Sequence, residues 1–529
     1  MERSSKTTTD VVNLLKTSEL LTQSVRTVIE EWSQESSGKS SADGGAPKTL
    51  PSRTLHEAQR TILAICGTLT ELVSEPPSRV IEVACQYWES RALYIAAERR
   101  IPDLLSTPSA SETGISALEL GKATGIEHQK LSRLLRCLCS IHIFREVAPD
   151  VFANNVTSAA LVNNEPLRAY VLLFNLDVYT ASDQLPKYLL GGKGHSYKVD
   201  ETAWQDAVGT TKPRWDWLEE KHSPNDLIAS SGAGYPGLPS LKREDINGVS
   251  KEKLVGRPEL EVFGLAMLGG GLVFGAAHPY DYPWDQLGEA TIVDVGGGVG
   301  GFDIQLSRLY PKLKFVIQDR GPVLEQGEHT VWPKENPQAL ADGRVRFMQH
   351  DFFDVNPVKD ADVYWLRYII HDWSTPYALL ILRAIRASMT SRASRILICD
   401  QVMNTTFGSP QLHGAPSPLP ANYGYYTRYS HHRDLAMMGI INGIERTPSQ
   451  FRELVEEAGL RVERIWECRS QVSVVECRAV FGVEVKGEGV KVNGGKVEGD
   501  TVNGVEGGRQ GELGGAERIE LLEAGMMDG

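Results

Sequence analysis

The sequence predicts an α/β protein, with a mostly parallel Rossmann-like sheet in its second half and an all-helical, winged-helix region before it. Three observations lead to this prediction. Residues 291–310 have the pattern of a strand, a glycine-rich turn and a helix. Strand and helix patterns then alternate, which is typical of a parallel sheet. Residues 116–153 have the pattern of a helix–turn–helix followed by a hairpin.

The glycine-rich turn follows a short β-branched run that ends in Asp294 and Val295. Five of the six residues 296–301 are glycine. Glycine lets the backbone turn sharply and approach a ligand without a Cβ in the way. The helix that we expect from Phe302 presents unpaired N–H groups at its start. We therefore expect a small-molecule site at this turn.

The alternation that follows predicts five parallel strands and the helices between them. The predicted strands span 291–295, 313–318, 344–349, 362–367 and 395–401. The predicted helices span 302–309, 322–327, 376–389 and 448–458. Two further β-rich runs, 461–467 and 471–480, have no helix between them. They predict an antiparallel hairpin at the edge of the sheet.

The first part of the chain has helical periodicity over 9–34, 55–74 and 77–99. The last of these runs is apolar over much of its circumference, so we expect it to be buried, in the chain itself or in a subunit interface. Between the first two helices, residues 33–54 are rich in Ser, Gly, Pro and Lys and are typical of a flexible linker.

The helix–turn–helix pattern begins with Ser116 and Glu119, which form a capping-box signature. Gly125 makes the turn, the second helix spans 127–138, and 144–153 predicts a β-hairpin. Such a winged helix either binds DNA or serves as a packing and dimerisation module. The second interpretation is favoured here, because the chain is acidic and carries a small-molecule site.

Composition limits the function further. The 529 residues are 41% hydrophobic and 23% charged, with a net charge of −13, which is unfavourable for general binding to nucleic acid. No apolar run reaches the length of a membrane-spanning helix, and the N-terminus lacks the apolar core of a signal peptide. Seven scattered cysteines predict neither a zinc site nor a disulfide framework. We expect a cytoplasmic protein without a membrane or nucleic-acid partner.

The glycine turn matches the string G-x-G-x-x-G at Gly296, Gly298 and Gly301, which alone also suits a dinucleotide. Asp319, at the end of the second strand, is placed to bind a ribose. Asp351 and Phe352 suit the amine and ring face of adenine, although a helix cap and a core aromatic residue explain them equally.

His371 follows a buried strand and therefore lies at the carboxyl end of the sheet, where open α/β sheets bind ligands. Histidine is the side chain best suited to accept a proton near neutral pH. Asp372 is its neighbour, and Asp400 and Glu445 lie at the ends of later elements. A structural histidine remains the alternative interpretation.

Taken together, these motifs make the chain resemble the S-adenosylmethionine-dependent O-methyltransferases of the plant caffeate and flavonoid type. Within that family it is most similar to the fungal secondary-metabolite branch, such as the sterigmatocystin O-methyltransferases. The motifs that carry the resemblance are Asp294–Gly300, Asp319, His350–Phe352, His371–Trp373, Asp400 and Gly443–Thr447.

The resemblance implies a role for each matched residue. His371 is expected to be the general base, oriented by two flanking acids, Asp400 and Glu445; Asp400 is one methylene shorter than the glutamate of the plant enzymes. S-adenosylmethionine is expected to contact Gly296, Gly298, Asp319, Asp351, Phe352 and Arg367. We further expect the substrate to contact Phe263, Met267 and Met438.

We thus expect a homodimeric, metal-independent enzyme that methylates a phenolic hydroxyl of a small, polyketide-like aromatic metabolite. An NAD(P)-dependent oxidoreductase and a winged-helix regulator with a cofactor domain remain alternatives. The expected domains are an N-terminal helix and linker (1–54), a winged-helix dimerisation domain (55–165), a catalytic domain (166–482) with insertions at 219–253 and 404–429, and a disordered tail (483–529).

Overall fold

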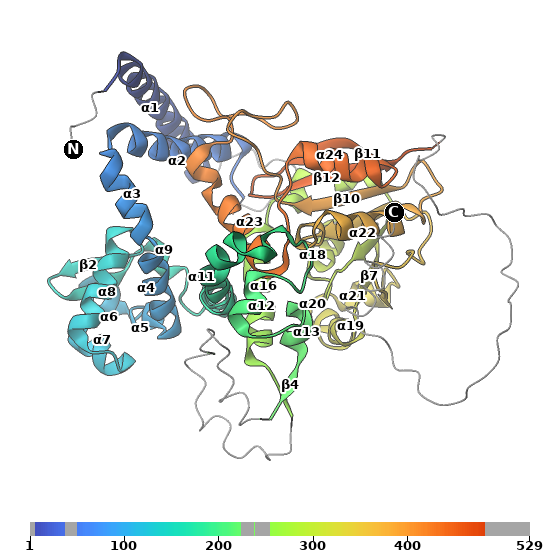
Figure 1. The fold of residues 1–529 in the computed structure, drawn as a ribbon, viewed down its shortest axis with the longest axis horizontal. Coiled ribbons are helices and arrows are strands. Elements are labelled where there is room, and N and C mark those ends of the chain that lie inside the picture. The colour runs from blue at the N-terminus through green and yellow to red at the C-terminus, as the bar shows by residue number, and fades with distance from the viewer. Residues whose placement is uncertain (1–5, 38–49, 224–236, 238–253, 482–529) are drawn as a thin grey trace, which may run out of the picture.

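The computed structural model describes residues 6–37, 50–223, 237 and 254–481. The predicted tail, most of the predicted linker and most of the insertion 219–253 lie outside the described residues. Figure 1 shows an N-terminal helical lobe on one side of the molecule and a large sheet on the other.

The large sheet has seven strands in the order β11-β12-β10-β9-β6-β7-β8. Strands β6 to β10 are parallel, and β12 pairs antiparallel with both β10 and β11. The predicted parallel sheet and its antiparallel edge hairpin are therefore confirmed. The strands are β6 (Thr291–Val295), β7 (Lys314–Asp319), β8 (Val345–Gln349), β9 (Val363–Arg367), β10 (Arg395–Asp400), β11 (Leu460–Glu467) and β12 (Ser473–Ala479).

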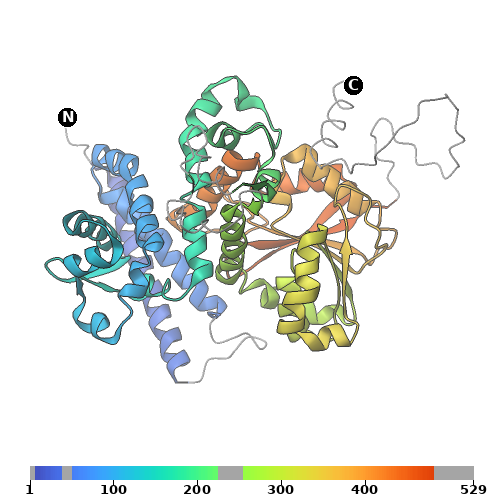
Figure 2. The same ribbon diagram turned by 90° about the horizontal axis from the view of Figure 1, so that it is seen from below.

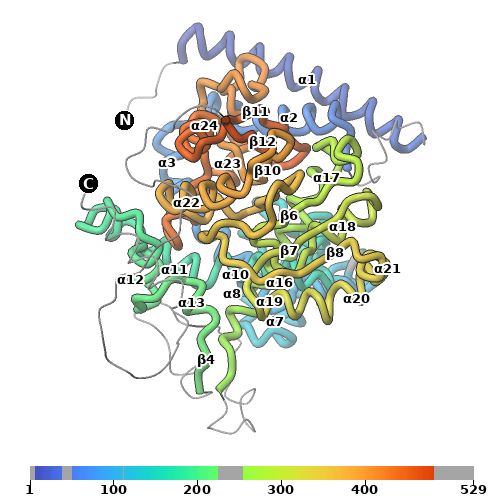
Figure 3. Tube along the Cα trace, turned by 90° about the vertical axis from the view of Figure 1, so that its right-hand side faces the viewer, coloured from blue at the N-terminus to red at the C-terminus, as the bar shows by residue number. Residues whose placement is uncertain are grey.

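Apolar side chains alternate between the two faces of the sheet, because successive residues of a strand point in opposite directions. Tyr364 and Leu366 of β9 share a core with helices α22 (Thr375–Arg386) and α24 (Pro448–Glu457). Trp365, between them, joins the opposite core with Phe302 of α18 (Gly301–Leu309). Figure 3 shows α22 and α24 on one side of the strands and α18 on the other.

The predicted winged helix is present. Helix α7 (Ala117–Thr124) starts with the Ser116–Glu119 capping box and ends at Gly125, which has a φ of 72°. Helix α8 (His128–Ser140) follows, and β2 (Phe144–Ala148), β3 (Val151–Asn154) and β1 (Ile115–Ser116) form a small antiparallel sheet. The apolar side of α8 is fully buried.

The helical pattern over 77–99 was expected to form one buried helix, and the structure differs in two respects. It is divided at Gln86 into α3 (Pro76–Cys85) and α4 (Tyr87–Glu98), because the Gln86 N–H donates to the Val83 carbonyl in a tighter turn. Helix α3 buries no side chain within the chain, and Val80 and Ile81 are 70% and 66% exposed.

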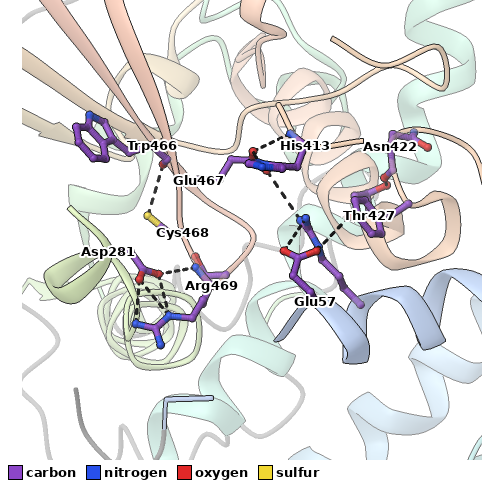
Figure 4. A network of polar contacts seen from close by, with 12 residues as sticks. Glu57, Asp281, His413, Asn422, Thr427, Trp466, Glu467, Cys468 and Arg469 are labelled. Carbon is purple, nitrogen blue, oxygen red and sulfur yellow. Dashed lines mark hydrogen bonds and ion pairs between the residues drawn. The ribbon is translucent and has the colours of Figure 1, made fainter. Parts of the chain in front are cut away.

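The predicted helices over 9–34 and 55–74 form α1 (Thr8–Ser36) and α2 (Arg53–Val73), which pack against each other. Helix α2 also packs against residues 404–427, through Ile65 and Tyr423. Its first residue, Arg53, pairs with Asp281, and Figure 4 shows the same carboxylate facing Arg469 of the loop between β11 and β12.

Helices between the lobe and the sheet include α10 (Glu165–Leu173), α11 (Asp177–Leu190) and α16 (Pro258–Phe274); they appear in green in Figure 2, beside α23 (Arg428–Ile441). The remaining elements are short: α5 (Ile101–Leu104), α6 (Pro108–Thr113), α9 (Val156–Ala159), η2 (Gly192–His195), α12 (Ala203–Val208), α13 (Arg214–Glu219), β4 (Lys221–His222), β5 (Val255–Gly256), α17 (His278–Asp281), η3 (Trp284–Leu287), α19 (Gly321–Gln326), η4 (Gly327–Val331), α20 (Trp332–Glu335), α21 (Pro337–Ala341), η5 (Ile370–Asp372) and η6 (Gly424–Thr427).

Candidate active site

The glycine turn connects β6 to α18 at the carboxyl end of the sheet. Gly296 and Gly300 have φ angles of 74° and 77°, in the left-handed region that disfavours other residues. A Cβ on Gly296 would lie 2.5 Å from Ile369 Cδ1, and one on Gly300 would lie 2.4 Å from Ile317 Cδ1. Both the backbone conformation and the lack of space therefore require glycine.

Asp319, the last residue of β7, lies directly beside this turn. Its Oδ2 accepts from the Gly298 N–H at 2.7 Å, and its Oδ1 accepts from the Arg320 N–H at 2.7 Å. Burial raises the pKa of this carboxyl, while the two N–H donors lower it. The turn and the carboxylate predicted to bind ribose thus form one hydrogen-bonded unit.

Asp351 and Phe352 follow β8. Asp351 Oδ1 accepts from the Phe353 N–H at 3.0 Å. The Phe352 ring comes within 3.9 Å of the position that a Cβ on Gly296 would take, and it packs edge-on against Trp373. The aromatic side chain predicted for adenine therefore lies next to the glycine turn.

Arg367, the last residue of β9, lies between α18 and α16. Its guanidinium is 5.3 Å from the Phe302 ring centroid, and a Cβ on Gly275 would lie 3.4 Å from its Nη1. Below the turn are two buried acids that the sequence reasoning did not select, Asp294 and Asp303. Burial raises the pKa of Asp303 well above its usual value, and the charge of Asp294 adds to this effect.

His371 lies in the turn η5 after β9, and its side chain is buried. Its Nδ1 forms a hydrogen bond of 2.8 Å with Glu445 Oε1, and its Nε2 lies 3.3 Å from Asp372 Oδ1. A carboxylate on Nδ1 fixes the tautomer in which Nδ1 carries the proton, which leaves the Nε2 lone pair to accept one.

The segment that carries Glu445 is fixed to the His371 turn by backbone contacts. The Ile444 N–H donates to the His371 carbonyl at 2.8 Å. The Arg446 guanidinium donates to the carbonyls of Ile370 and Trp373, both at 2.8 Å. The distance between His371 and Glu445 is therefore set by the backbone as well as by the side chains.

The surrounding charges decide the protonation of His371. Burial disfavours the imidazolium, but Glu445 and Asp372 outweigh burial and raise the pKa of His371 to about 9. Burial raises the pKa of Glu445, but the positive charges of His371 and Arg433 more than offset this effect. The pKa of Glu445 therefore lies below its usual value. The carboxylate and the imidazolium thus stabilise each other.

Asp400, the second acid expected to orient His371, is placed differently from Glu445. It is buried at the end of β10, but within the described part of the chain neither carboxylate oxygen has a hydrogen-bond partner. Burial raises the pKa of Asp400 to about 6, against the opposing effect of His371. Its shorter side chain interacts with the imidazole only through charge.

The three side chains predicted to line the substrate differ in exposure. Phe263 is half-buried against Trp215, Met267 is 44% exposed, and Met438 is half-buried on α23.

An aromatic cluster that the sequence reasoning did not select includes one side chain beside His371. The Tyr368 ring centroid is 5.6 Å from that of His371, and Phe274 stacks on Tyr429 at 4.7 Å. The hydroxyl of Tyr170 is in hydrogen-bond contact with that of Tyr429. The Arg433 guanidinium lies 4.7 Å from the Tyr368 centroid, so the cluster gathers side chains from α10, α16, α23 and the loop after β9. No local motif in the sequence marks these residues, because they come from four separate elements.

Comparison with known proteins identifies the chemistry of this site. Residues 284–461 match the model of the O-methyltransferase domain, and residues 81–164 match that of the O-methyltransferase dimerisation domain. O-methyltransferase cicE of Emericella nidulans is 60% identical, covering 90% of this chain and 91% of the relative. O-methyltransferase gedA of Aspergillus terreus is 58% identical, covering 90% and 98%. The chain belongs to the O-methyltransferase family.

The O-methyltransferase fold also has solved counterparts. The mitomycin 7-O-methyltransferase MmcR is 25% identical with a TM-score of 0.53, and the match covers 77% of this chain and 98% of that one. A structure of LepI in complex with SAM shares the fold at 20% identity, with a TM-score of 0.59 and coverage of 86% and 100%.

Family membership confirms three expectations from the sequence: the resemblance to the O-methyltransferases, the fold class, and the enzyme class, an S-adenosylmethionine-dependent O-methyltransferase. Membership of this family argues against both alternatives, the nicotinamide-dependent oxidoreductase and the winged-helix regulator. Among the described residues, no helix is long and apolar enough to cross a membrane.

Proposed function

We propose that this enzyme methylates a phenolic hydroxyl of a small aromatic, polyketide-like secondary metabolite, with His371 as the general base. The observation that carries the proposal is the Nδ1 hydrogen bond of His371 to Glu445 at the carboxyl end of the sheet. It leaves Nε2 as the ring nitrogen that accepts a proton. We further propose that the enzyme acts in the cytoplasm.

The residues around the glycine turn fit the adenosyl cofactor. A Cβ on Gly298 would meet no atom within 4 Å among the described residues, so the backbone there is open to close approach. The proposed contacts are the turn with the methionine part, Asp319 with the ribose hydroxyls, Asp351 and Phe352 with adenine, and Gly298 and Arg367 beside them. When bound, S-adenosylmethionine supplies a methyl group activated by its sulfonium.

The chain must then hold the acceptor and remove its proton. A phenol has a pKa of about 10, by analogy with tyrosine. The pKa of about 9 for His371 is close to this value, so the transfer of a proton from the hydroxyl to Nε2 is nearly balanced. Glu445 stabilises the imidazolium that forms, and the backbone contacts at residues 444 and 446 keep the ring in place.

The aromatic side chains beside His371 support an aromatic acceptor. The Tyr368 ring lies beside His371, and Phe274 stacks on Tyr429 in the same cluster. Such rings favour a flat aromatic molecule through stacking and apolar contact. Phe263, Met267 and Met438 remain proposed contacts for parts of the acceptor farther from the reacting oxygen.

A homodimer formed through the N-terminal domain completes the proposal. The match to the dimerisation domain begins at residue 81, within α3, and this helix presents its apolar side chains to solvent in the single chain. An exposed apolar helix face of this kind is typical of a subunit interface.

A methyl-transfer screen tests the function directly. One-, two- and three-ring phenols are incubated with the enzyme and S-adenosylmethionine carrying a radiolabelled methyl group. We expect a labelled methyl ether from the wild type and none from His371→Ala, which should still bind S-adenosylmethionine in a calorimetric titration. Label transfer by His371→Ala at the wild-type rate would exclude His371 as the base.

The pH dependence gives a second test. His371 must be neutral to accept a proton, and its pKa in the free enzyme is about 9. We therefore expect kcat/KM to rise roughly tenfold per pH unit below that value and to level off above it. A profile already flat between pH 7 and 9 would contradict this assignment.

A further inference from the structure

Glu445 Oε1 has two cationic neighbours, although the proposed function uses only one of them. His371 Nδ1 lies 2.8 Å from this oxygen, and Arg433 Nε lies 3.2 Å from it. Glu445 is fully buried and Arg433 nearly so, with 11% of its side chain exposed. In such a place charges interact far more strongly than in water.

Arg433 is held at this oxygen by its own helix. The next residue of α23, Asp434, accepts from the Glu445 N–H at 2.9 Å, so two consecutive residues of α23 contact Glu445. The guanidinium also lies 4.7 Å from the centroid of Tyr368, whose ring is 5.6 Å from that of His371. Arg433, Glu445, His371 and Tyr368 thus form a closed set of contacts.

We propose that Arg433 is a positioning residue that shares the Glu445 carboxylate with His371 and thereby keeps His371 able to act as a base. The proposal rests on the function proposed for His371. Without Arg433, the carboxylate would serve the imidazolium alone and would hold the proton on His371 more strongly. Arg433 itself need not touch the substrate or the cofactor.

The other charges around His371 do not replace Arg433. Asp372 on the same turn and Asp400 at the end of β10 both favour the imidazolium. Arg446 donates to backbone carbonyls, and Asp434 is bound to the Glu445 N–H. Arg214 of α13 acts on Asp372, and Tyr368 is a phenol whose pKa is raised by burial and which is neutral at neutral pH. Among these groups, Arg433 is the cation that opposes the imidazolium.

A titration that needs no acceptor tests the proposal. The full-length enzyme is labelled with carbon-13 at Cε1 of its 12 histidines, and His371→Gln assigns the His371 signal. We expect the His371 signal to titrate at higher pH in Arg433→Gln than in the wild type. Arg433→Lys should lie between the two, since it restores the charge but not the planar geometry. Arg428→Gln removes an equal charge from the first turn of α23 and should leave the titration unchanged.

A second set of measurements separates this role from a merely structural one. Arg433→Met retains the alkyl packing against Tyr368 and repeats the test if the glutamine variant does not fold. With the phenol methylated in the screen, we expect kcat/KM at pH 7 to fall roughly tenfold for each unit by which the titration rises, with the dissociation constant for S-adenosylmethionine unchanged.

An unchanged or lower titration of His371 in Arg433→Gln and Arg433→Met would overturn the proposal. Methylation by His371→Ala would instead contradict the function proposed for His371. The two failures are therefore distinguishable.

Discussion

At the scale of single residues, the two acids near His371 have different roles. Glu445 contacts the imidazole directly, is itself paired with Arg433, and keeps a pKa below its usual value. Asp400 is equally buried, but it lacks a hydrogen-bond partner within the described residues and has a pKa of about 6. Glu445 is therefore the acid that fits the proposed role of orienting His371. Asp400 adds a buried negative charge, and its burial lowers the stability of the fold.

This difference predicts how Asp400→Asn responds to pH. The folded-state pKa of Asp400, about 6, lies above the usual value of 3.8, so folding favours its protonated form. Its contribution to stability is therefore greatest at low pH and is lost as the pH rises through 6. The neutral amide avoids this loss. We expect the unfolding free energy of Asp400→Asn, relative to the wild type, to rise by roughly 1–2 kcal/mol as the pH is raised from 5 to 8. Thermal unfolding at the two pH values measures this change.

The matched variant is Glu445→Gln, which removes the hydrogen-bonded acid. We expect it to abolish most methyl transfer and to destabilise the fold, because Arg433 and His371 lose their common partner. If Asp400→Asn showed the same loss of stability at pH 8 as Glu445→Gln, the two acids would not differ in the way described.

At the scale of elements, the glycine turn depends on particular glycines. Alanine at Gly300 would have to adopt a φ of 77°, and its Cβ would overlap Ile317 and Trp332. The left-handed conformation alone costs about 1–2 kcal/mol, and overlap in a packed core adds to it. We expect Gly300→Ala to lower the unfolding temperature and to weaken binding of S-adenosylmethionine, measured by calorimetry.

Gly301, the adjacent residue, is the control. It begins α18 without a positive φ, and a Cβ there would meet no atom within 4 Å among the described residues. Gly301→Ala should be neutral or slightly stabilising, since it removes freedom from the unfolded chain. Equal destabilisation by the two substitutions would show that the turn does not depend on the geometry of Gly300.

The fold could be predicted where a local sequence pattern determines an element, and could not be predicted where tertiary contacts determine it. The central strands were found because both of their faces are buried, so continuous apolar runs such as 291–295 and 395–400 stand out in the sequence. Helix α23 was missed because its sequence, which begins Arg428–Asp434, has no apolar stripe. The helix is stabilised by tertiary contacts, which local patterns do not encode.

The candidate site was likewise predictable only where short sequence motifs mark its residues. His371 and Glu445 were predicted from short motifs, and the structure brings them to 2.8 Å although 74 positions separate them. Arg433 and the aromatic cluster lie in no motif. Tyr368 is only three positions from His371, but Arg433, Tyr170, Phe274 and Tyr429 join the cluster only when α10, α16 and α23 are packed together, so no reasoning from local pattern reaches them.

At the scale of the whole molecule, the N-terminal helices contact the sheet domain at Asp281, which is part of a buried ion pair. The Asp281 side chain has no exposed surface and pairs with Arg469 at 2.9 Å (Figure 4). It also pairs at 2.8 Å with Arg53 of α2, whose side chain is 57% exposed. Asp281→Ala would leave the 4%-exposed Arg469 without its carboxylate. We expect a loss of about 3–5 kcal/mol in unfolding free energy, measured in denaturant. Glu463→Ala breaks the exposed pair with Arg461 and should change stability by less than about 1 kcal/mol.

The apolar surface of α3 and α4 leads to the last prediction, which concerns assembly. Val80, Ile81 and Trp88 are 60–70% exposed in the single chain, and these two helices begin the dimerisation domain. Isolated exposed apolar residues are common, but several in succession along adjoining helices indicate a protein interface. We expect light scattering to give twice the monomer mass of 58.3 kDa for the wild type.

Ile81→Glu together with Trp88→Glu should convert this dimer to a monomer, because two buried, unpaired carboxylates would oppose association. Phe407→Glu is the control, since Phe407 is 97% exposed but lies in the loop before α23. The proposed cofactor contacts lie between Gly296 and Arg367, outside α3 and α4, so we expect the monomer still to bind S-adenosylmethionine. A double variant that remained dimeric would place the interface on another surface, and the exposure of α3 would then need a different partner.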